Sequence, residues 1–153
     1  MKNEKLPSIA IASDHAGFLQ KEFLKMQLEK MGFSITDLGC EGPGSVNYPD
    51  FAAKVASEIL AGRADRGILI CGSGEGMVMA ANRFAGIRAG LAWNTEIAAL
   101  LRAHNNAQII CLGARFTANE YALQMVEVFL KTDFQEGNHT RRVEMLDQLV
   151  RSS

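Results

Sequence analysis

The stretch 67–83 of the sequence reads Gly-Ile-Leu-Ile-Cys-Gly-Ser-Gly-Glu-Gly-Met-Val-Met-Ala-Ala-Asn-Arg. Its apolar run 68–70 predicts a short buried strand, and the glycines after Cys71 predict a turn that leads into a helix. Because glycine has no side chain, such a turn lets a ligand approach the backbone closely, and the free N–H groups of the helix's first turn would face an anion. The stretch therefore predicts an anion-binding turn with a thiol at its edge.

The same pattern also has a plainer interpretation. Glycine turns often follow buried strands in α/β proteins, and cysteine is often just a small core residue. A single glycine-rich turn is a weak motif, so the rest of the chain has to distinguish a site from a structural turn.

Length and composition favour one domain spanning residues 1–153. Hydrophobic residues make up 48% and charged residues 22% of the chain, and the formal net charge is -1, which argues against disorder and against a nucleic-acid partner. The N-terminal stretch Met-Lys-Asn-Glu-Lys-Leu-Pro lacks the apolar core of a signal peptide, and no run approaches about 18 apolar residues. We therefore expect a cytoplasmic protein with no membrane partner.

The three cysteines, Cys40, Cys71 and Cys111, are an odd number without the paired spacing of metal ligands. This argues against a disulfide framework and against a structural zinc site, and it fits free thiols in a reducing compartment. We expect no bound metal.

Strands and helices are expected to alternate along the chain. Apolar or alternating runs predict strands at 8–12, 33–38, 68–70, 87–92 and 108–112. Apolar residues at helical spacing, with capping signals, predict helices at 18–31, from 49, after 76, at 95–103, at 117–131 and from about 140. In the first of these helices, Leu19, Phe23 and Met26 recur at that spacing.

This alternation predicts a single-domain, three-layer Rossmann-like α/β fold. Crossovers between parallel strands must be helical and right-handed, so the five strands form a parallel sheet with helices on both faces. The usual five-stranded order is 2-1-3-4-5, and ligands bind beyond the carboxyl ends of the first and third strands, where the winding reverses.

Three ionisable side chains follow those two strands. Asp14 and His15 come after the first strand and Cys71 after the third, so we expect them to converge on one crevice. A cysteine at a helix N-terminus can act as a base or nucleophile near neutral pH, which makes Cys71 the candidate. Cys111 lies inside an apolar strand and is expected in the core, while Ser73 can either cap the helix or contact a ligand.

His104 and Asn105 follow the fourth helix. Both residue types suit a helix C-terminus, which is the structural interpretation of this pair. A helix antiparallel to the strands ends at the amino edge of the sheet, so His104 should lie about 15 Å from Cys71 of its own chain. If His104 is catalytic, another subunit must supply it.

Arginines are the available anion binders, and most arginines are simply solvated. Arg115 follows the fifth strand at the ligand edge, and Arg142 starts the last helix beside His139, so both can reach a phosphate. Arg141 is most readily assigned to the surface. The other two candidates are Arg83 and Arg88.

Taken together, the segments resemble the ribose-5-phosphate isomerase B family, which also includes the galactose-6-phosphate isomerase subunits. The resemblance spans nearly the whole chain, with its motifs in the family's order. It rests on Ser13-Asp-His-Ala-Gly17, Asn47-Tyr-Pro-Asp-Phe-Ala52, Ile70-Cys-Gly-Ser-Gly-Glu-Gly-Met77, Ala80-Ala-Asn-Arg-Phe-Ala-Gly-Ile-Arg-Ala89, His104-Asn-Asn-Ala107 and Leu112-Gly-Ala-Arg115.

The resemblance implies an aldose-ketose isomerase that interconverts ribose 5-phosphate and ribulose 5-phosphate through a cis-enediolate, without a metal or organic cofactor. Its catalytic residues would be Cys71, Asp14, His104 and Ser73. Asp14 and His104 would open the sugar ring, and Cys71 would move the proton between C2 and C1. The substrate-binding residues would be His15, Tyr48, Gly72, Gly74, Glu75, Gly76, Asn105, Arg115 and Arg142.

In this set, backbone N–H groups of the 72–76 loop would hold the enediolate, since an oxyanion hole is placed where charge develops. His15, Arg115 and Arg142 would hold the phosphate. We expect a homodimer, or a dimer of dimers, with shared active sites, and a C-terminal helix at about 140–151 that contacts the partner.

Two departures from the family pattern leave the sugar open. Many members have an arginine where this chain has Asn138, and the family's common aspartate before Tyr-Pro is Asn47 here. The alternatives are an isomerase of another sugar phosphate, of the galactose 6-phosphate or allose 6-phosphate type, or a sugar-phosphate binding module without catalysis.

Overall fold

One parallel five-stranded sheet forms the centre of the molecule, and its strand order is β2-β1-β3-β5-β4. The computed structural model describes residues 4–149. The strands are β1 (Ile9–Ser13), β2 (Ile35–Asp37), β3 (Arg66–Cys71), β4 (Ala89–Leu91) and β5 (Ile109–Gly113). The predicted α/β class, with a parallel sheet between two layers of helices, is confirmed.

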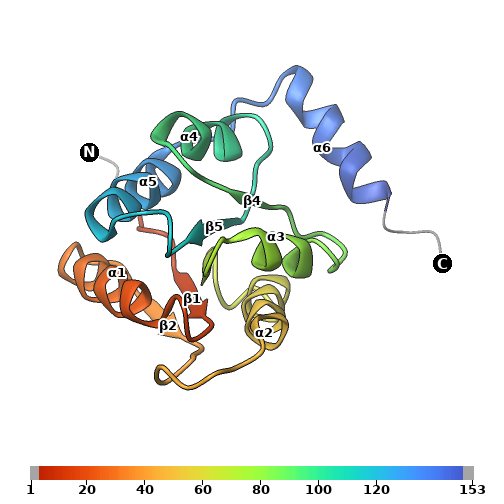
Figure 1. Cartoon of the computed structure of the whole chain (residues 1–153). Helices are drawn as coiled ribbons and strands as arrows, with labels where there is room; N and C mark the ends of the chain where they lie inside the picture. Colours follow the sequence, from red (N-terminus) through yellow and green to blue (C-terminus); the bar gives the residue numbers. More distant parts are fainter. Residues whose placement is uncertain (1–3, 150–153) are drawn as a thin grey trace.

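Helices cover both faces of this sheet (Figure 1). Helices α1 (Phe18–Lys30), α4 (Thr95–Ala103) and α5 (Asn119–Lys131) share one face, and helices α2 (Tyr48–Leu60) and α3 (Glu75–Ala81) share the other. Helix α6 (Asn138–Gln148) stands away from both layers (Figure 1). Part of the helix predicted at about 140–151 lies outside the described residues.

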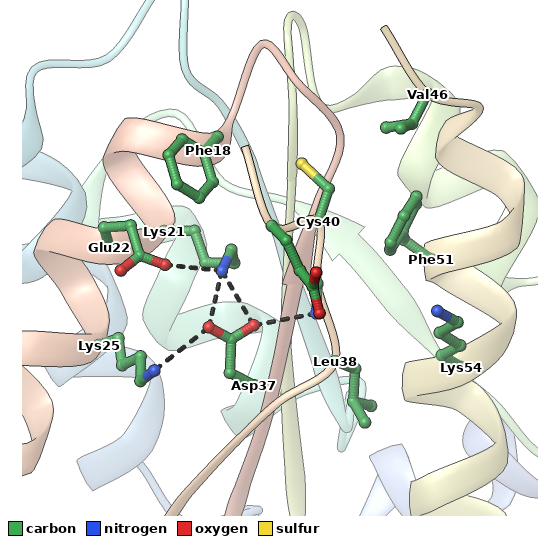
Figure 2. A pocket seen from close by; sticks show the side chains of 12 residues that line it. Phe18, Lys21, Glu22, Lys25, Asp37, Leu38, Cys40, Val46, Phe51 and Lys54 are labelled. Carbon is green, nitrogen blue, oxygen red and sulfur yellow. Dashed lines mark hydrogen bonds and ion pairs between the residues drawn. The ribbon is translucent and has the colours of Figure 1, made fainter. Parts of the chain in front are cut away.

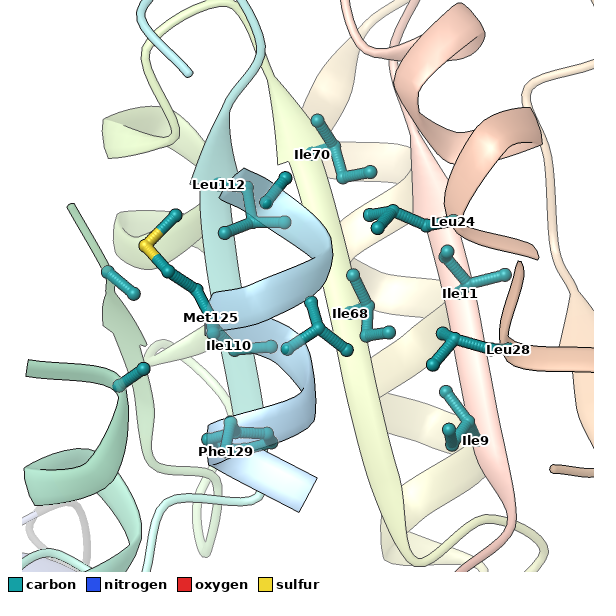
Figure 3. Packing of buried hydrophobic residues seen from close by; sticks show 14 of the residues in the cluster. Ile9, Ile11, Leu24, Leu28, Ile68, Ile70, Ile110, Leu112, Met125 and Phe129 are labelled. Atoms are coloured by element: carbon teal, nitrogen blue, oxygen red, sulfur yellow. The ribbon is translucent and has the colours of Figure 1, made fainter. Parts of the chain in front are cut away.

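On the face covered by α1 and α5, the three middle strands are held by close packing of buried side chains (Figure 3). Isoleucine and leucine side chains of β1, β3 and β5 interlock there with helix residues such as Leu24, Leu28, Met125 and Phe129, all fully buried. Burying one such side chain stabilises the fold by about 1.5–3 kcal/mol. The carboxyl ends of these strands therefore form a firm base for the loops that follow them.

The predicted order 2-1-3-4-5 is wrong for the last two strands. Strand β5 pairs with β3, and β4 lies at the edge beside β5. The reason is burial: every residue of β5 is buried, whereas the short β4 is only half-buried throughout. A central strand is covered on both faces, and the five residues Ile-Ile-Cys-Leu-Gly of β5 supply more apolar surface for that position than the three residues Ala-Gly-Leu of β4.

Helix α1 does not bury the residues that its apolar spacing indicated. Leu19 is 77% exposed and Met26 51% exposed, whereas Lys21 is 1% exposed and lies in line with the buried Leu24 and Leu28. The ammonium of Lys21 pairs with Asp37, so its aliphatic stem can occupy a core position. A lysine in the buried stripe hides that stripe from a hydrophobicity pattern.

Within residues 4–149, no helix has the length and apolar character needed to cross a membrane. The cytoplasmic location stays a prediction.

Candidate active site

The ends of β1 and β3 bring Asp14 beside the start of the glycine loop. Ser13 pairs with Ile70 in the sheet, and the next amide, Asp14 N, donates to Ile70 O at 3.1 Å. The Asp14 carboxylate is 7% exposed and accepts hydrogen bonds from Ala16 N at 3.0 Å and Gly17 N at 3.2 Å. These bonds hold Asp14 in one orientation at the start of α1.

The loop after β3 folds back onto the sulfur of Cys71. Gly74 N donates to Cys71 Sγ at 3.2 Å, and Gly74 has φ +81°, a conformation that glycine adopts without strain. Glu75 N donates to Ser73 Oγ at 3.3 Å. Two of the loop amides are therefore engaged inside the loop, and Cys71 Sγ is a hydrogen-bond acceptor.

Helix α3 begins at Glu75, earlier than predicted, so Gly76 lies in its first turn. In the described part of the chain, no acceptor reaches the amides of Gly76 and Met77. These amides follow directly after the loop that holds Cys71. They can bind a negatively charged oxygen.

Tyr48 and Arg115 flank the same loop from two other elements. A Cβ atom on Gly76 would lie 2.6 Å from Cζ of Tyr48, and one on Gly72 would lie 3.0 Å from Nη1 of Arg115. The tyrosine is the first residue of α2, and Arg115 follows β5. A side chain at position 76 would therefore clash with the Tyr48 ring, and one at position 72 would press on the Arg115 guanidinium, so a phenol and a guanidinium both lie at the loop.

His15 is tied to the loop between β2 and α2. Its Nδ1 accepts a hydrogen bond from Val46 N at 3.2 Å, so a neutral His15 carries its proton on Nε2. Val46 also lines a cavity of about 880 Å³ between α1, β2 and α2 (Figure 2). That cavity is lined by Lys21, Asp37, Cys40 and Phe51 among others, and it does not include Cys71.

Four of the charged groups that line this cavity, Lys21, Glu22, Lys25 and Asp37, pair with one another. Lys21 Nζ donates to Glu22 Oε1 at 2.8 Å and to both Asp37 oxygens, at 2.9 and 2.7 Å (Figure 2). Burial alone would lower the pKa of Lys21, but these bonds raise it above its usual value. Burial alone would likewise raise the pKa of Asp37, yet the bonds from Lys21 and Gly39 N lower it. The ion pair is structural and fixes the end of β2.

The other two cysteines have no comparable position. Cys111 is fully buried in β5, where burial raises the pKa of its thiol, so the prediction of a core residue is confirmed. Cys40 is buried beside Ser13, and its Sγ donates to Gly42 O at 3.3 Å. All three thiols are free.

His104 and Asn105 lie at the opposite edge of the sheet. Helix α4 ends at Ala103, and the turn that follows is bonded to Arg88, which directly precedes β4. Cys71 ends β3 at the carboxyl edge, so His104 is separated from it by a strand length, about 15 Å. The two groups do not share a site within one chain.

His139 stacks on His104 with ring centroids 4.2 Å apart and an angle of 13° between the planes. Partial removal from water, together with the positive charges of His104 and Arg142, lowers the pKa of His139. Asn138 is the first residue of α6, and both it and Arg142 are exposed. The predicted site residues thus form two groups at opposite edges of the sheet.

One group contains Asp14, His15, Tyr48, Cys71, the 72–76 loop with Ser73, and Arg115. The other contains His104, Asn105 and Arg142. The guanidinium of Arg88, considered above as an anion binder, instead donates hydrogen bonds to acceptors of the chain itself, Asn105 O, Asn106 O and Asp147 Oδ1. Among residues 4–149, no three His, Cys, Asp or Glu side chains are grouped as metal ligands would be.

Comparison of the chain with known proteins identifies similar proteins of one family. The family model described as Ribose/Galactose Isomerase matches residues 9–146. A putative sugar phosphate isomerase of Bacillus subtilis is 40% identical over 88% of this chain and 91% of its own. A crystal structure of a ribose 5-phosphate isomerase from Thermotoga maritima superposes with a TM-score of 0.92 at 46% identity, covering 94% of this chain and 99% of that one.

A ribose-5-phosphate isomerase B from Mycoplasma genitalium, solved with bound ribulose-5-phosphate, has a TM-score of 0.90 at 38% identity and covers 95% of this chain and 97% of that one. These likenesses extend over the sheet, the glycine loop and the turn after α4 alike. With a matching family model over 9–146 and relatives of this identity along nearly their whole length, the chain belongs to the ribose/galactose isomerase family.

Proposed function

We propose that this protein interconverts ribose 5-phosphate and ribulose 5-phosphate. One cluster at the carboxyl edge of the sheet supports this proposal most directly. The Cys71 thiol and the Asp14 carboxylate lie at adjacent strand ends, and two amides without an acceptor lie in the first turn of α3, directly after the loop that follows Cys71. Family membership and the bound ribulose-5-phosphate of the Mycoplasma genitalium relative support a pentose phosphate as substrate.

In the proposed mechanism, Cys71 is the base. Its thiolate removes the proton from C2 of the open-chain aldose, and the electrons of that bond form the C1–C2 double bond while O1 becomes negatively charged. The amides of Gly76 and Met77 stabilise this oxygen. The proton then passes from Sγ to C1 and the O2 hydroxyl gives its proton to O1, which yields the ketose with no net loss of atoms.

Ring opening and phosphate binding use the remaining groups. Asp14, held by two backbone amides, exchanges a proton with the ring hydroxyl, and His104 of another chain serves the ring oxygen. Ser73, and Asn105 of the other chain, contact the sugar oxygens, and Tyr48 borders the loop. His15 and Arg115, together with Arg142 of the other chain, bind the phosphate through charge-assisted hydrogen bonds.

The separation of the two residue groups supports a homodimer with shared sites. A chain carries Cys71 at one edge of its sheet and His104 at the other, so a twofold axis would let each chain complete its partner's site. No cofactor is needed for this proton transfer.

Exposed apolar side chains support the same assembly. Leu19, Trp93 and Phe116 follow the carboxyl ends of β1, β4 and β5 and are 77%, 61% and 82% exposed. Met145 and Leu146 of helix α6 and Leu149 directly after it are also exposed. Large exposed apolar surface marks sites of association, so we assign these residues, with the C-terminal helix, to the contact between chains.

A second candidate substrate is a hexose 6-phosphate. Asn138, at the start of α6 and four residues before Arg142, removes one cation from the proposed phosphate site. A site with fewer fixed cations would hold the phosphate at a different place and could admit a longer sugar.

The test is turnover of ribose 5-phosphate, ribulose 5-phosphate, allose 6-phosphate and galactose 6-phosphate by the purified protein, with product identified by NMR. We expect the highest kcat/KM with the pentose phosphates. Turnover of a hexose phosphate alone would replace the substrate and keep the mechanism. Tight binding of a sugar phosphate without turnover would reject catalysis and leave a binding module.

A further inference from the structure

Arg88 connects the two segments that carry His104, Asn105 and Arg142. Its Nε donates to Asn105 O at 3.1 Å and its Nη2 donates to Asn106 O at 3.1 Å. Its Nη1 donates to Asp147 Oδ1 at 2.7 Å. A single guanidinium therefore bonds the turn after α4 and the C-terminal half of α6 at the same time.

The turn is also bonded from its inner side. Asn106 has φ +46°, in the left-handed region that asparagine adopts more readily than other side chains. From the inner side, the buried Arg102 donates through Nη1 to Asn106 Oδ1 at 2.9 Å and to Ala107 O at 2.8 Å. Arg102 holds the base of the turn, and Arg88 holds its outer carbonyls.

Helix α6 depends on the same guanidinium. Val143 is the one residue of α6 between 138 and 148 that is buried, and the Arg88–Asp147 ion pair fixes the helix near its other end. At its start, His139 stacks on His104. The turn and α6 are thus joined at two contacts, the His104–His139 stack and the bonds of the Arg88 guanidinium.

Arg88 itself is rigid. Its backbone N donates to Gln108 Oε1 at 2.7 Å, and its carbonyl accepts from Gln108 N at 3.0 Å, so it is anchored to the chain that enters β5. Its side chain is 14% exposed. The position of the guanidinium is therefore fixed by the backbone bonds of Arg88 to Gln108, next to β5, and not by the turn and α6 to which it donates.

We propose that Arg88 is a positioning residue for the reaction: it sets the 104–106 turn and α6 as one unit, so that His104, Asn105 and Arg142 reach the partner's site together. This inference rests on the proposed function. Arg88 does not contact the substrate and acts through the residues that do. Its planar fork is suited to three acceptors, which a lysine ammonium on a flexible stem cannot reproduce.

The first test compares kinetics of Arg88→Lys and Asp147→Asn with those of wild type. Arg88→Lys loosens the turn and α6, so kcat should fall about tenfold or more and KM should rise. Asp147→Asn removes the charge of the pair and keeps an amide oxygen as acceptor, so it weakens the hold on α6 alone, and KM should rise more than kcat falls. Arg63→Lys is the matched control, because Arg63 forms a similar arginine–carboxylate pair with Glu58 at an exposed site on the loop after α2 and should leave both constants unchanged.

The second test does not require turnover. The ring signals of His104 and His139 in the unliganded protein should carry the shifts of a stacked pair, and Arg88→Lys should move both while the His15 signal stays in place. If wild type turns over none of the sugar phosphates, the proposed function fails and this NMR experiment alone decides the role of Arg88. Unchanged histidine shifts, with kcat and KM within about twofold of wild type where there is turnover, would overturn the inference. If Arg88→Lys does not fold, Asp147→Asn decides through the shift of His139 and the KM.

Discussion

Cys71 and Cys40 are both buried cysteines near the carboxyl edge, and their sulfur atoms have different hydrogen-bond partners. Cys71 Sγ accepts from Gly74 N, while Cys40 Sγ donates to Gly42 O. A backbone amide is therefore directed at the sulfur of the proposed base, whereas the sulfur of Cys40 is engaged by a carbonyl oxygen.

Replacing Cys71 with serine should remove turnover and keep binding. A hydroxyl is a much weaker base than a thiolate, so Cys71→Ser should lower kcat about a thousandfold, with a sugar-phosphate dissociation constant close to that of wild type. Calorimetry measures the binding and a coupled assay the rate. Cys40→Ser is the matched control, since a hydroxyl can still donate to Gly42 O, and it should keep wild-type kcat. Near-normal turnover by Cys71→Ser would remove Cys71 from the mechanism.

Position along the strands was enough to predict that Asp14 and Cys71 lie at neighbouring strand ends, while the shared site with His15 stays a prediction. Parallel strands end at the same edge of a sheet. Residues that directly follow neighbouring strands therefore lie close together, regardless of how the surrounding side chains pack. The contacts of Tyr48 and Arg115 with the loop could not be predicted in this way, because they depend on which helix and which strand lie beside β3. Lys21 was missed because its buried ammonium is paired in part with Asp37, a residue of another element that the helical spacing does not reveal.

The order of β4 and β5 matters for the site. With β5 beside β3, Cys71 pairs with Gly113, and Arg115 N donates to Gly72 O at 3.1 Å. In the predicted order 2-1-3-4-5, β4 would lie beside β3. Trp93, which follows β4, would then lie near the glycine loop in place of Arg115. The apolar run 109–112 is uninterrupted, whereas 87–91 contains Arg88 and the small residues Ala89 and Gly90. This difference favours β5 as the central strand, but the usual five-stranded order was given more weight.

Helix α6 carries the proposed phosphate ligand Arg142 on an exposed face. A charge-assisted hydrogen bond contributes about 1.5–3 kcal/mol, so Arg142→Ala should raise KM by about tenfold to a hundredfold. Arg141→Ala is the control, because the neighbouring Arg141 is also exposed and is assigned to the surface; its KM should be that of wild type. An equal rise in KM for the two variants would mean that the loss of one positive charge, and not the loss of a specific contact with the phosphate, weakens binding.

Asn138→Arg is the converse change on the same helix. If position 138 faces the phosphate, the added cation should lower KM for at least one pentose or hexose phosphate in a steady-state assay. No change with any substrate would place the phosphate elsewhere and would count against the assignment of α6 to the site.

The assembly of two chains can be tested by mixing two inactive variants. Cys71→Ala and His104→Ala homodimers should each be nearly inactive, because every site lacks one group. In a mixed dimer, one site receives both wild-type residues and the other receives both substitutions. Random pairing of equal amounts makes about half the dimers mixed, so activity should recover to roughly a quarter of wild type.

The measurement is to unfold and refold the two variants together and to compare the activity with that of each refolded alone. Subunit exchange is verified by giving one variant an affinity tag and detecting the untagged chain in the purified fraction. Exchange without recovery would place His104 in the same site as its own Cys71, or outside the site.

The position of the turn after α4, at the edge of the sheet opposite Cys71, would also make activity depend on how much enzyme is present. A site made of two chains exists only while the chains are associated, so specific activity should fall on dilution below the dimer's dissociation constant. Sugar phosphate bound across both chains favours association by mass action, so substrate should lower the protein concentration at which that loss occurs. The enzyme would then be held together, in dilute conditions, by the compound that it converts.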